Sequence, residues 1–189
     1  MTTNSEVNTI LIVDDNPNNL GVLSDFLWDM GFEILIARDG ESALQKAKYV
    51  IPALILLDVM MPGIDGFETC RQLKSNPETR EIPVIFMTAL SDTSNKVNGF
   101  SLGAVDYITK PFQQDEVLAR IKLHLQLRTL NKTLIEHNSQ LQSEVELRKA
   151  AETSLSQLSQ ELESRIVSRT HELSQALEEL KQTQLQLSR

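Results

Sequence analysis

The sequence has almost no cysteine and no long apolar run. Cys70 is the one cysteine among 189 residues, so an internal disulfide framework is excluded and a reducing compartment is expected. No window approaches the roughly 18 continuous apolar residues of a membrane-spanning helix. Residues 1–6 lack the basic and apolar regions of a signal peptide. These absences predict a cytoplasmic protein without a membrane segment, in which Cys70 is a packing residue.

A second absence is regional. Residues 113–189 contain no glycine, proline, methionine, phenylalanine, tyrosine or tryptophan, whereas residues 1–112 hold all of them. Charge divides at the same place, with 15 acidic and 8 basic residues in the first part (net −7) and 11 acidic and 10 basic in the second (net −1). The change predicts a domain boundary. The acidic first part argues against a nucleic-acid backbone as its direct partner.

The first part alternates apolar runs with helical patterns. Apolar runs predict buried strands at residues 9–13, 53–57 and 82–87. Two further strands are predicted at residues 32–37 and 104–108. Helices are predicted between them, at 17–30, 41–49, 66–74 and, with weak patterning, 92–102. In the first helix, the positions expected to face the sheet are Leu20, Leu23, Phe26, Leu27 and Met30. This alternation predicts a parallel sheet with right-handed crossovers.

The central apolar run, Leu54–Leu57, ends in a carboxylate, Asp58. In an open α/β sheet, ligands bind beyond the carboxyl ends of the strands, so Asp58 lies where chemistry is expected. The following residues place Pro62 and Gly63 at the second and third positions of a turn, the pairing that a type II turn requires. For Asp58 taken alone, the alternative is a simple cap on the next helix.

Polar side chains also follow the other predicted strands at this edge. Asp14 and Asp15 follow the first strand, Thr88 the fourth and Lys110 the fifth. Oxygen ligands of this kind suit Mg²⁺, which accepts one or two direct carboxylates and keeps several waters. A carboxylate such as Asp58 can accept a phosphoryl group covalently, while a metal and a lysine neutralise the charge that develops. The combination predicts a site for phosphoryl transfer.

On these residues the sequence resembles the receiver domain of two-component response regulators. The matching segments are 12–15, 57–66, 87–89 and 104–112, and the resemblance covers roughly residues 9–125. It implies an α/β, doubly wound, flavodoxin-like sheet of five parallel strands in the order 2-1-3-4-5. Residues 1–8, which precede the matched region, are expected to be a disordered N-terminus. It also implies that a histidine kinase or a phosphotransfer protein is the phosphoryl donor.

The resemblance assigns roles around the metal. Asp58 is implied to be the phosphoacceptor. Asp15, Asp58 and the backbone carbonyl of Met60 are implied to ligate Mg²⁺, and Asp14 is implied to reach the metal largely through water. Three further positions are implied to act on the phosphoryl group or to report it. Thr88 and Lys110 would contact its oxygens, and the rotamer of Tyr107 would change on phosphorylation.

The resemblance also implies a cis peptide at Lys110-Pro111, and X-Pro bonds cost little in the cis form. Every one of these positions carries the residue type that the family pattern requires.

From Gln113 onward nothing breaks a helix, so the last receiver helix is expected to continue through residues 113–189. One apolar series in steps of three and four comprises Leu123, Leu127, Leu130, Leu134, Leu141, Ala151, Leu155, Leu158 and Leu162. A second, offset by four from Leu162, repeats every seven residues at Ile166, Leu173, Leu180 and Leu187, and such an offset is a stutter. The pattern predicts a homodimeric coiled coil that is weakest at His137, Glu144 and Arg148. A parallel arrangement is expected because two receivers at one end can drive one output at the other only if both helices run in the same direction. For any single block, a helix packed on a protein surface is the alternative.

Residues 163–173 resemble the signalling helix that precedes histidine-kinase dimerisation domains. His171 is not expected to be a phosphorylated histidine, because it falls at the outermost position f when Ile166 is counted as a, and no proline or glycine-rich ATP-binding lobe follows. His124 and His137 are interpreted as helix-face residues, since neither has a companion at metal-ligand spacing.

Three functions remain open from the sequence. The first is a receiver that relays phosphorylation of Asp58 through the helix to an output module. The second is the N-terminal part of a hybrid histidine kinase or nucleotide cyclase whose catalytic domain lies beyond Arg189. The third is a scaffold with a degenerate receiver, against which the complete set of acidic, threonine and lysine residues argues. Because the chain ends in mid-heptad at residues 187–189, it is expected to be part of a longer protein.

Overall fold

The structure is a computed structural model, and it describes residues 8–89 and 101–187. The chain divides into two compact units, Met1–Lys132 and Thr133–Arg189. Most of the helix expected at 92–102, and residues 1–7 of the segment expected to be disordered, lie outside the described residues. Among the helices that are described, none combines the length and the apolar character needed to cross a membrane.

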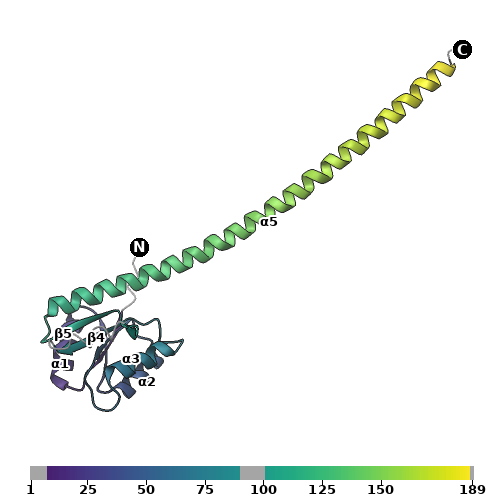
Figure 1. The fold of residues 1–189 in the computed structure, drawn as a ribbon. Helices are drawn as coiled ribbons and strands as arrows, with labels where there is room; N and C mark the ends of the chain where they lie inside the picture. The colour runs from purple at the N-terminus through teal and green to yellow at the C-terminus, as the bar shows by residue number, and fades with distance from the viewer. Residues whose placement is uncertain (1–7, 90–100, 188–189) are drawn as a thin grey trace. The chain divides into compact units, whose positions relative to one another are not determined.

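A five-stranded parallel sheet forms the centre of the first unit (Figure 1). Its strands are β1 (Thr9–Val13), β2 (Glu33–Ala37), β3 (Leu54–Asp58), β4 (Val84–Ala89) and β5 (Asp106–Lys110). Their spatial order, β2-β1-β3-β4-β5, confirms the expected doubly wound, flavodoxin-like fold. Strands β4 and β5 begin and end two residues later than the apolar runs indicated, so Thr88 and Lys110 belong to the strands themselves.

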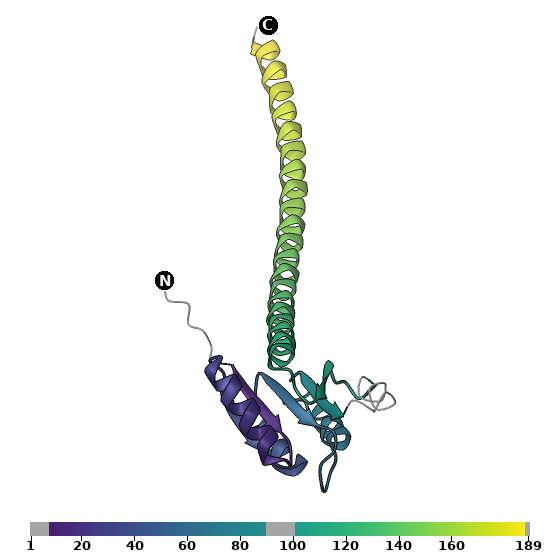
Figure 2. The same cartoon turned by 90° about the vertical axis from the view of Figure 1, so that its left-hand side faces the viewer.

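Helices cover both faces of the sheet. Helix α1 (Pro17–Asp29) and the first turns of α5 (Gln114–Leu187) pack on one face, where Leu23 lies in the same apolar cluster as Val117. Helices α2 (Gly40–Val50) and α3 (Gly66–Ser75) pack on the other face and contribute Ala43, Ala47, Cys70 and Leu73. The purple α1 is seen along its length in Figure 2. Because both faces are covered, every residue of the central strand β3 is buried.

Helix α1 begins where the sequence indicates. The side chain of Asn16 caps it by accepting a hydrogen bond from the Asn18 N–H, and proline occupies the first helical turn. Of the five positions expected to face the sheet, three are buried and Phe26 is partly buried against the core. Met30 is the exception, with 47% of its surface exposed. It is the C-cap rather than a helical residue, so it lies beyond the face that contacts the sheet.

The loop between β3 and α3 brings the start of α3 against the backbone of Asp58. Gly63 has a φ of 82°, as the third position of a type II turn requires. Gly66 donates its N–H to the carbonyl of Val59 at 3.0 Å. A Cβ atom on Gly66 would lie 2.2 Å from the carbonyl oxygen of Asp58 and 2.8 Å from the Cα of Val59. Only glycine fits here without moving the backbone that carries Asp58.

We expect Gly66→Ala to destabilise the receiver unit by about 2–3 kcal/mol, because rigid backbone rather than a flexible side chain occupies the space of the new methyl group. Gly21→Ala is the matched control. Gly21 is exposed within α1 and a Cβ there meets nothing within 4 Å, so we expect a gain of up to about 1 kcal/mol. Denaturant unfolding of the two variants measures both effects. Equal stability of the two variants would contradict the close approach at Gly66.

Two sets of polar contacts attach the start of α5 to the sheet. Asp106 on β5 accepts one hydrogen bond from Arg120, at 2.7 Å, and pairs with Nε2 of His124 at 3.0 Å. Further along the helix, the Arg128 guanidinium donates to the carbonyls of Pro52 and Ala53, which precede β3. Burial alone would raise the pKa of Asp106, but the hydrogen bonds from His124, Arg120 and the Tyr107 backbone, together with the charge of Arg120, outweigh burial and lower it.

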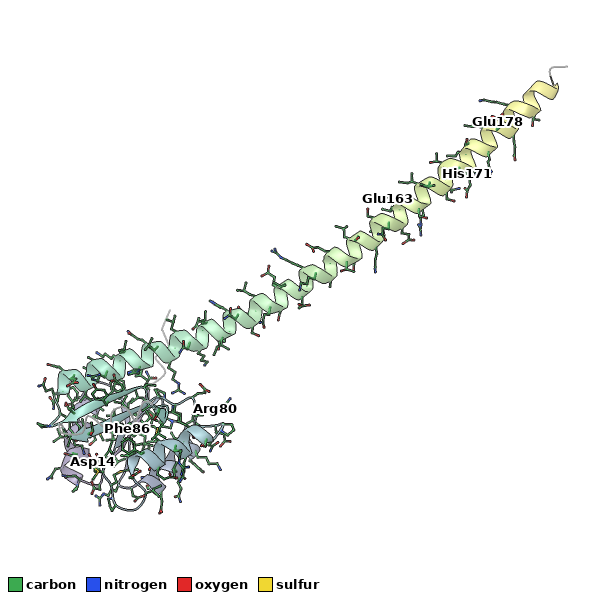
Figure 3. All side chains as sticks on the ribbon, viewed as in Figure 1. Asp14, Arg80, Phe86, Glu163, His171 and Glu178 are labelled. Atoms are coloured by element: carbon green, nitrogen blue, oxygen red, sulfur yellow. The ribbon has the colours of Figure 1, made fainter. Side chains whose placement is uncertain are left out.

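Within the second unit, the helix presents its apolar series to solvent. Leu155, Leu158, Leu162, Ile166 and Leu173 are all more than half exposed. In Figure 3, side chains project from every side of this part of the helix, among them the labelled Glu163, His171 and Glu178. The described side chains of this unit are therefore all solvent-exposed, apolar and polar alike.

Candidate functional site

Four of the predicted site residues come from four different strands. Asp14 directly follows β1, Asp58 ends β3, Thr88 lies in β4, and Lys110 ends β5. The ammonium of Lys110 lies 2.8 Å from Oδ2 of Asp14 and 2.7 Å from Oδ2 of Asp58. The parallel pairing of the strands brings their carboxyl ends together, and Lys110 joins two carboxylates that are far apart in the sequence.

Three carboxylates gather at this edge of the sheet. Asp14, Asp15 and Asp58 each offer one oxygen, and these oxygens lie within 4.8 Å of one another. Asp14 and Asp58 are buried, whereas Asp15 is exposed. One lysine leaves a surplus of negative charge among the three acids. A hard divalent cation such as Mg²⁺ fits this donor set, because it prefers carboxylate oxygens and retains waters on its open side.

Both carboxylate oxygens of Asp14 accept hydrogen bonds from other residues of the chain. The backbone N–H of Asn16 donates to Oδ1 at 2.8 Å, and the Asn19 amide lies 3.1 and 2.9 Å from the two oxygens. Lys110 adds a bond to Oδ2. With these partners in place, Asp14 is better suited to hold a metal-bound water than to bind a metal directly.

Asn19 is a site residue that was not predicted from the sequence. The available signal was a carboxamide in the first turn of the helix that begins directly after the acidic pair. From that turn its side chain reaches back to the carboxylate five residues earlier.

Asp58 and Lys110 influence one another's protonation. Burial raises the pKa of Asp58, although the hydrogen bond and the charge of Lys110 oppose this effect. Burial would lower the pKa of Lys110, but its hydrogen bonds to Asp14 and Asp58 outweigh burial and raise it. The lysine therefore remains a cation beside Asp58. The Met60 N–H lies 3.4 Å from Oδ1 of Asp58, which leaves that oxygen without a strong hydrogen bond in the described structure.

Thr88 and Tyr107 lie on the neighbouring strands β4 and β5. Thr88 is buried, and its hydroxyl makes a long 3.4 Å contact with the carbonyl of Ala89. The ring of Tyr107 packs partly buried against the apolar cluster on the α2 and α3 side, and the Arg120 guanidinium lies 5.7 Å from its centroid. The peptide bond between Lys110 and Pro111 is cis, as expected.

The histidines lie elsewhere. His124 pairs with Asp106, a partner that its spacing in the sequence did not reveal, and His171 contacts Gln175 on its own helix at 3.0 Å. The described arrangement is therefore a buried carboxylate, an adjacent cation and a group of oxygen donors. Such a set can hold a divalent metal and receive a phosphoryl group on a carboxylate oxygen.

Comparison with known proteins agrees with this arrangement. The profile of the response regulator receiver domain family matches residues 10–122. The chain is 43% identical over 145 residues to a probable cyclic di-GMP phosphodiesterase of Vibrio cholerae, covering 76% of this chain and 32% of that protein. It is 44% identical over 113 residues to the response regulator PleD of Caulobacter vibrioides, covering 60% and 25% of the two chains. It thus spans a third or less of the length of these relatives.

A solved structure shares the fold of the first unit. It is a putative response regulator from Chloroflexus aurantiacus, 38% identical, with a TM-score of 0.62 over 64% of this chain and 98% of the other. Receiver domains take a phosphoryl group from a histidine kinase or a phosphotransfer protein and bind Mg²⁺ at an acidic cluster, and such a cluster is present here. The chain therefore belongs to the response regulator receiver domain family of two-component signalling.

Proposed function

We propose that Asp58 accepts a phosphoryl group in a Mg²⁺-dependent reaction and that α5 relays the change, as a parallel homodimeric coiled coil, to an output module. The observation that carries the first half is the position of Lys110, which bridges Asp58 and Asp14 beside a cluster of three carboxylates. The second half is supported by the exposed leucine series of the helix.

In the proposed reaction, a carboxylate oxygen of Asp58 forms a bond to phosphorus while the bond from phosphorus to the donor breaks. Lys110 offsets the negative charge on the transferred group, and Thr88 contacts one of its oxygens. Asp15, Asp58 and the Met60 carbonyl would hold Mg²⁺, with Asp14 acting through water. When bound, the metal supplies the positive charge that lets a phosphoryl group approach an ionised carboxylate.

We propose that the conformational change caused by phosphorylation is transmitted from the site to α5 through β5. Tyr107 lies between Asp106, which binds Arg120 and His124 of α5, and the strand end at Lys110. A change at Thr88 and Tyr107 would therefore reach the helix through contacts already present. In this scheme residues 9–125 are the receiver, and residues 113–189 are the helix that carries the change away from it.

The helix requires a partner in this proposal because its apolar series has none within the described chain. The burial of apolar surface is worth about 25 cal/mol per Å², and a second copy offers the same series in the same spacing. The parallel arrangement follows from the proposed relay. Two receivers at one end can drive one output at the other only if both helices run in the same direction.

The proposed output module would follow the helix. The match to the Vibrio cholerae phosphodiesterase covers 145 residues, more than the family profile spans, so it reaches beyond the receiver. The relative therefore shares part of the segment that follows the receiver, and this supports the proposal that the helix connects the receiver to an output module. The alternative is that the chain is the N-terminal part of a hybrid histidine kinase or a nucleotide cyclase. The resemblance of residues 163–173 to a signalling helix supports this alternative.

A phosphorylation assay tests the proposed function. We expect the full chain, incubated with acetyl phosphate and Mg²⁺, to gain a single phosphoryl group that phosphate-affinity electrophoresis resolves and mass spectrometry of the borohydride-reduced peptide maps to Asp58. A chelator should abolish the uptake, and restored Mg²⁺ should recover it. Uptake without a divalent metal, or a modification mapped to Asp14 or Asp15, would overturn the assignment.

We expect Asp15→Asn to weaken Mg²⁺ binding at least about tenfold, because the change removes one of only two proposed direct carboxylate ligands. Calorimetric titration with MgCl₂ measures the affinity without depending on phosphorylation. Asp25→Asn is the control, since it removes an equal charge from an exposed position of α1 outside the acidic cluster. Unchanged affinity in the Asp15 variant would transfer the ligand role to Asp14.

A further inference from the structure

One ion pair of the helix falls on its apolar seam. The alternating spacing of three and four residues runs from Leu123 to Leu162, and within it the polar residues Glu144 and Arg148 fall at positions d and a. A guanidinium nitrogen of Arg148 lies 3.0 Å from Oε1 of Glu144, and both side chains are largely exposed. Two opposite charges therefore occupy adjacent layers of a face that is otherwise mostly leucine.

The other described ion pairs of the second unit are placed differently. Glu146 and Lys149, 3.6 Å apart, occupy the outer positions f and b of the same heptads. The pairs Glu161–Arg165 and Arg169–Glu172 each place their glutamate at the flanking position g. Among the ion pairs described along this part of the helix, Glu144–Arg148 is the one with both members at a and d.

We propose that Glu144 of each copy pairs with Arg148 of the second copy, forming a charged layer that fixes the register of the dimer. This inference rests on the proposed homodimer. In a parallel coiled coil, a side chain at d enters a hole formed by four residues of the facing helix. For Glu144 these are the partner positions 141, 144, 145 and 148, so the carboxylate meets the guanidinium of the second copy. The two-fold symmetry produces this contact twice.

The charged layer selects one alignment over its alternatives. A slip of one heptad keeps most leucines paired, but it places Glu144 opposite Ala151 and Arg148 opposite Leu155, which leaves charges desolvated without partners. Buried ion pairs add little to stability compared with apolar residues, while an unpaired buried charge is costly. The leucines therefore drive association, and the charged layer decides the register.

The same contact argues for parallel chains. An antiparallel pairing that set Glu144 opposite Arg148 would bring Ile166 opposite residue 126 and Leu173 opposite residue 119 of the other copy. Residue 126 is a glutamine and residue 119 is an alanine. Ile166 and Leu173 would then pack against these side chains instead of against the apolar side chains of their own series. In the parallel arrangement, the whole of both series can pair.

Complementary charge variants of the full chain test this layer. Glu144→Arg places four arginines at the layer of a homodimer, and Arg148→Glu places four glutamates there, so each homodimer should be about tenfold weaker or more. Mixed together, the two variants should form heterodimers in large excess over the statistical half. Neither variant retains the pair within one helix, so preferential mixing reports a contact between copies. Native mass spectrometry of chains with different mass tags measures the proportions.

The outer pair provides the matched control. Glu146→Lys mixed with Lys149→Glu should give dimers in statistical proportions and homodimers of wild-type affinity, because positions f and b face away from the partner. Statistical mixing of the seam variants, with wild-type dimerisation intact, would overturn the charged layer alone. A wild-type chain that is monomeric by sedimentation would overturn the proposed homodimer, and with it this inference.

Discussion

An Asp58→Asn variant is expected to take up no measurable phosphoryl group from acetyl phosphate and Mg²⁺. The amide cannot supply the anionic oxygen that attacks phosphorus, and it also removes one of the proposed metal ligands. Among the three acids of the cluster, Asp58 is the one that ends the central strand, and it is buried and in direct contact with Lys110. Phosphate-affinity electrophoresis measures the loss.

The melting temperature of this variant shows whether phosphorylation is lost because the acceptor is missing or because the protein is unfolded. Burial raises the pKa of Asp58 in the folded state. The folded protein therefore holds this proton more tightly than the unfolded chain does, so the ionised group costs stability as the pH rises above the unfolded pKa. Removing the charge removes that cost, and in metal-free buffer at neutral pH we expect Asp58→Asn to melt no lower than wild type.

Asp65→Asn is the control. Its side chain caps α3 by accepting from the Glu68 N–H, and asparagine also serves as an N-cap. This variant should be phosphorylated normally. Continued uptake by Asp58→Asn would refute the assignment of the phosphoacceptor.

The second large effect is expected from removing the helix. A chain of residues 1–132, which contains the complete first unit, should be monomeric at concentrations where the full chain is a dimer. The exposed leucines beyond residue 133 supply the apolar surface that drives association in this proposal. Analytical ultracentrifugation compares the two chains directly.

A single substitution tests the same interface without truncation. Leu158→Asp puts a charge into the middle of the seam and should dissociate the full-length dimer. Gln157→Asp is its partner control, because it adds the same charge at position c on the outer face. An equally tight dimer of residues 1–132, or of the Leu158 variant, would mean that association uses a different surface.

The residues that define the sheet could be read from the sequence with little ambiguity. Runs such as Leu54–Leu57 have no polar alternation, which only a strand covered on both faces tolerates, and Asn16-Pro17 is a strong start signal for a helix. The convergence of Asp14, Asp58 and Lys110 also followed, since parallel strands bring their carboxyl ends to one edge. The strand limits were less certain, because Thr88 and Lys110 are polar but continue the ladder of strand pairing.

The coiled coil and the roles of the individual site residues remain predictions. Heptad spacing indicates which helix face is apolar. It does not indicate which molecule binds that face.

By itself, the sequence determined the order of elements, the edge of the sheet where acids, threonine and lysine meet, and the unbroken helix after residue 113. These depend on patterns within a few residues of one another, which local sterics and burial impose. Three contacts were decided only by the tertiary structure. Lys110 contacts both Asp14 and Asp58, and the Asn19 amide donates hydrogen bonds to the Asp14 carboxylate. Asp106 pairs with Arg120 and His124. Each of these depends on which side chains reach one another across separate elements, a matter of distance and direction in space that spacing along the chain does not specify.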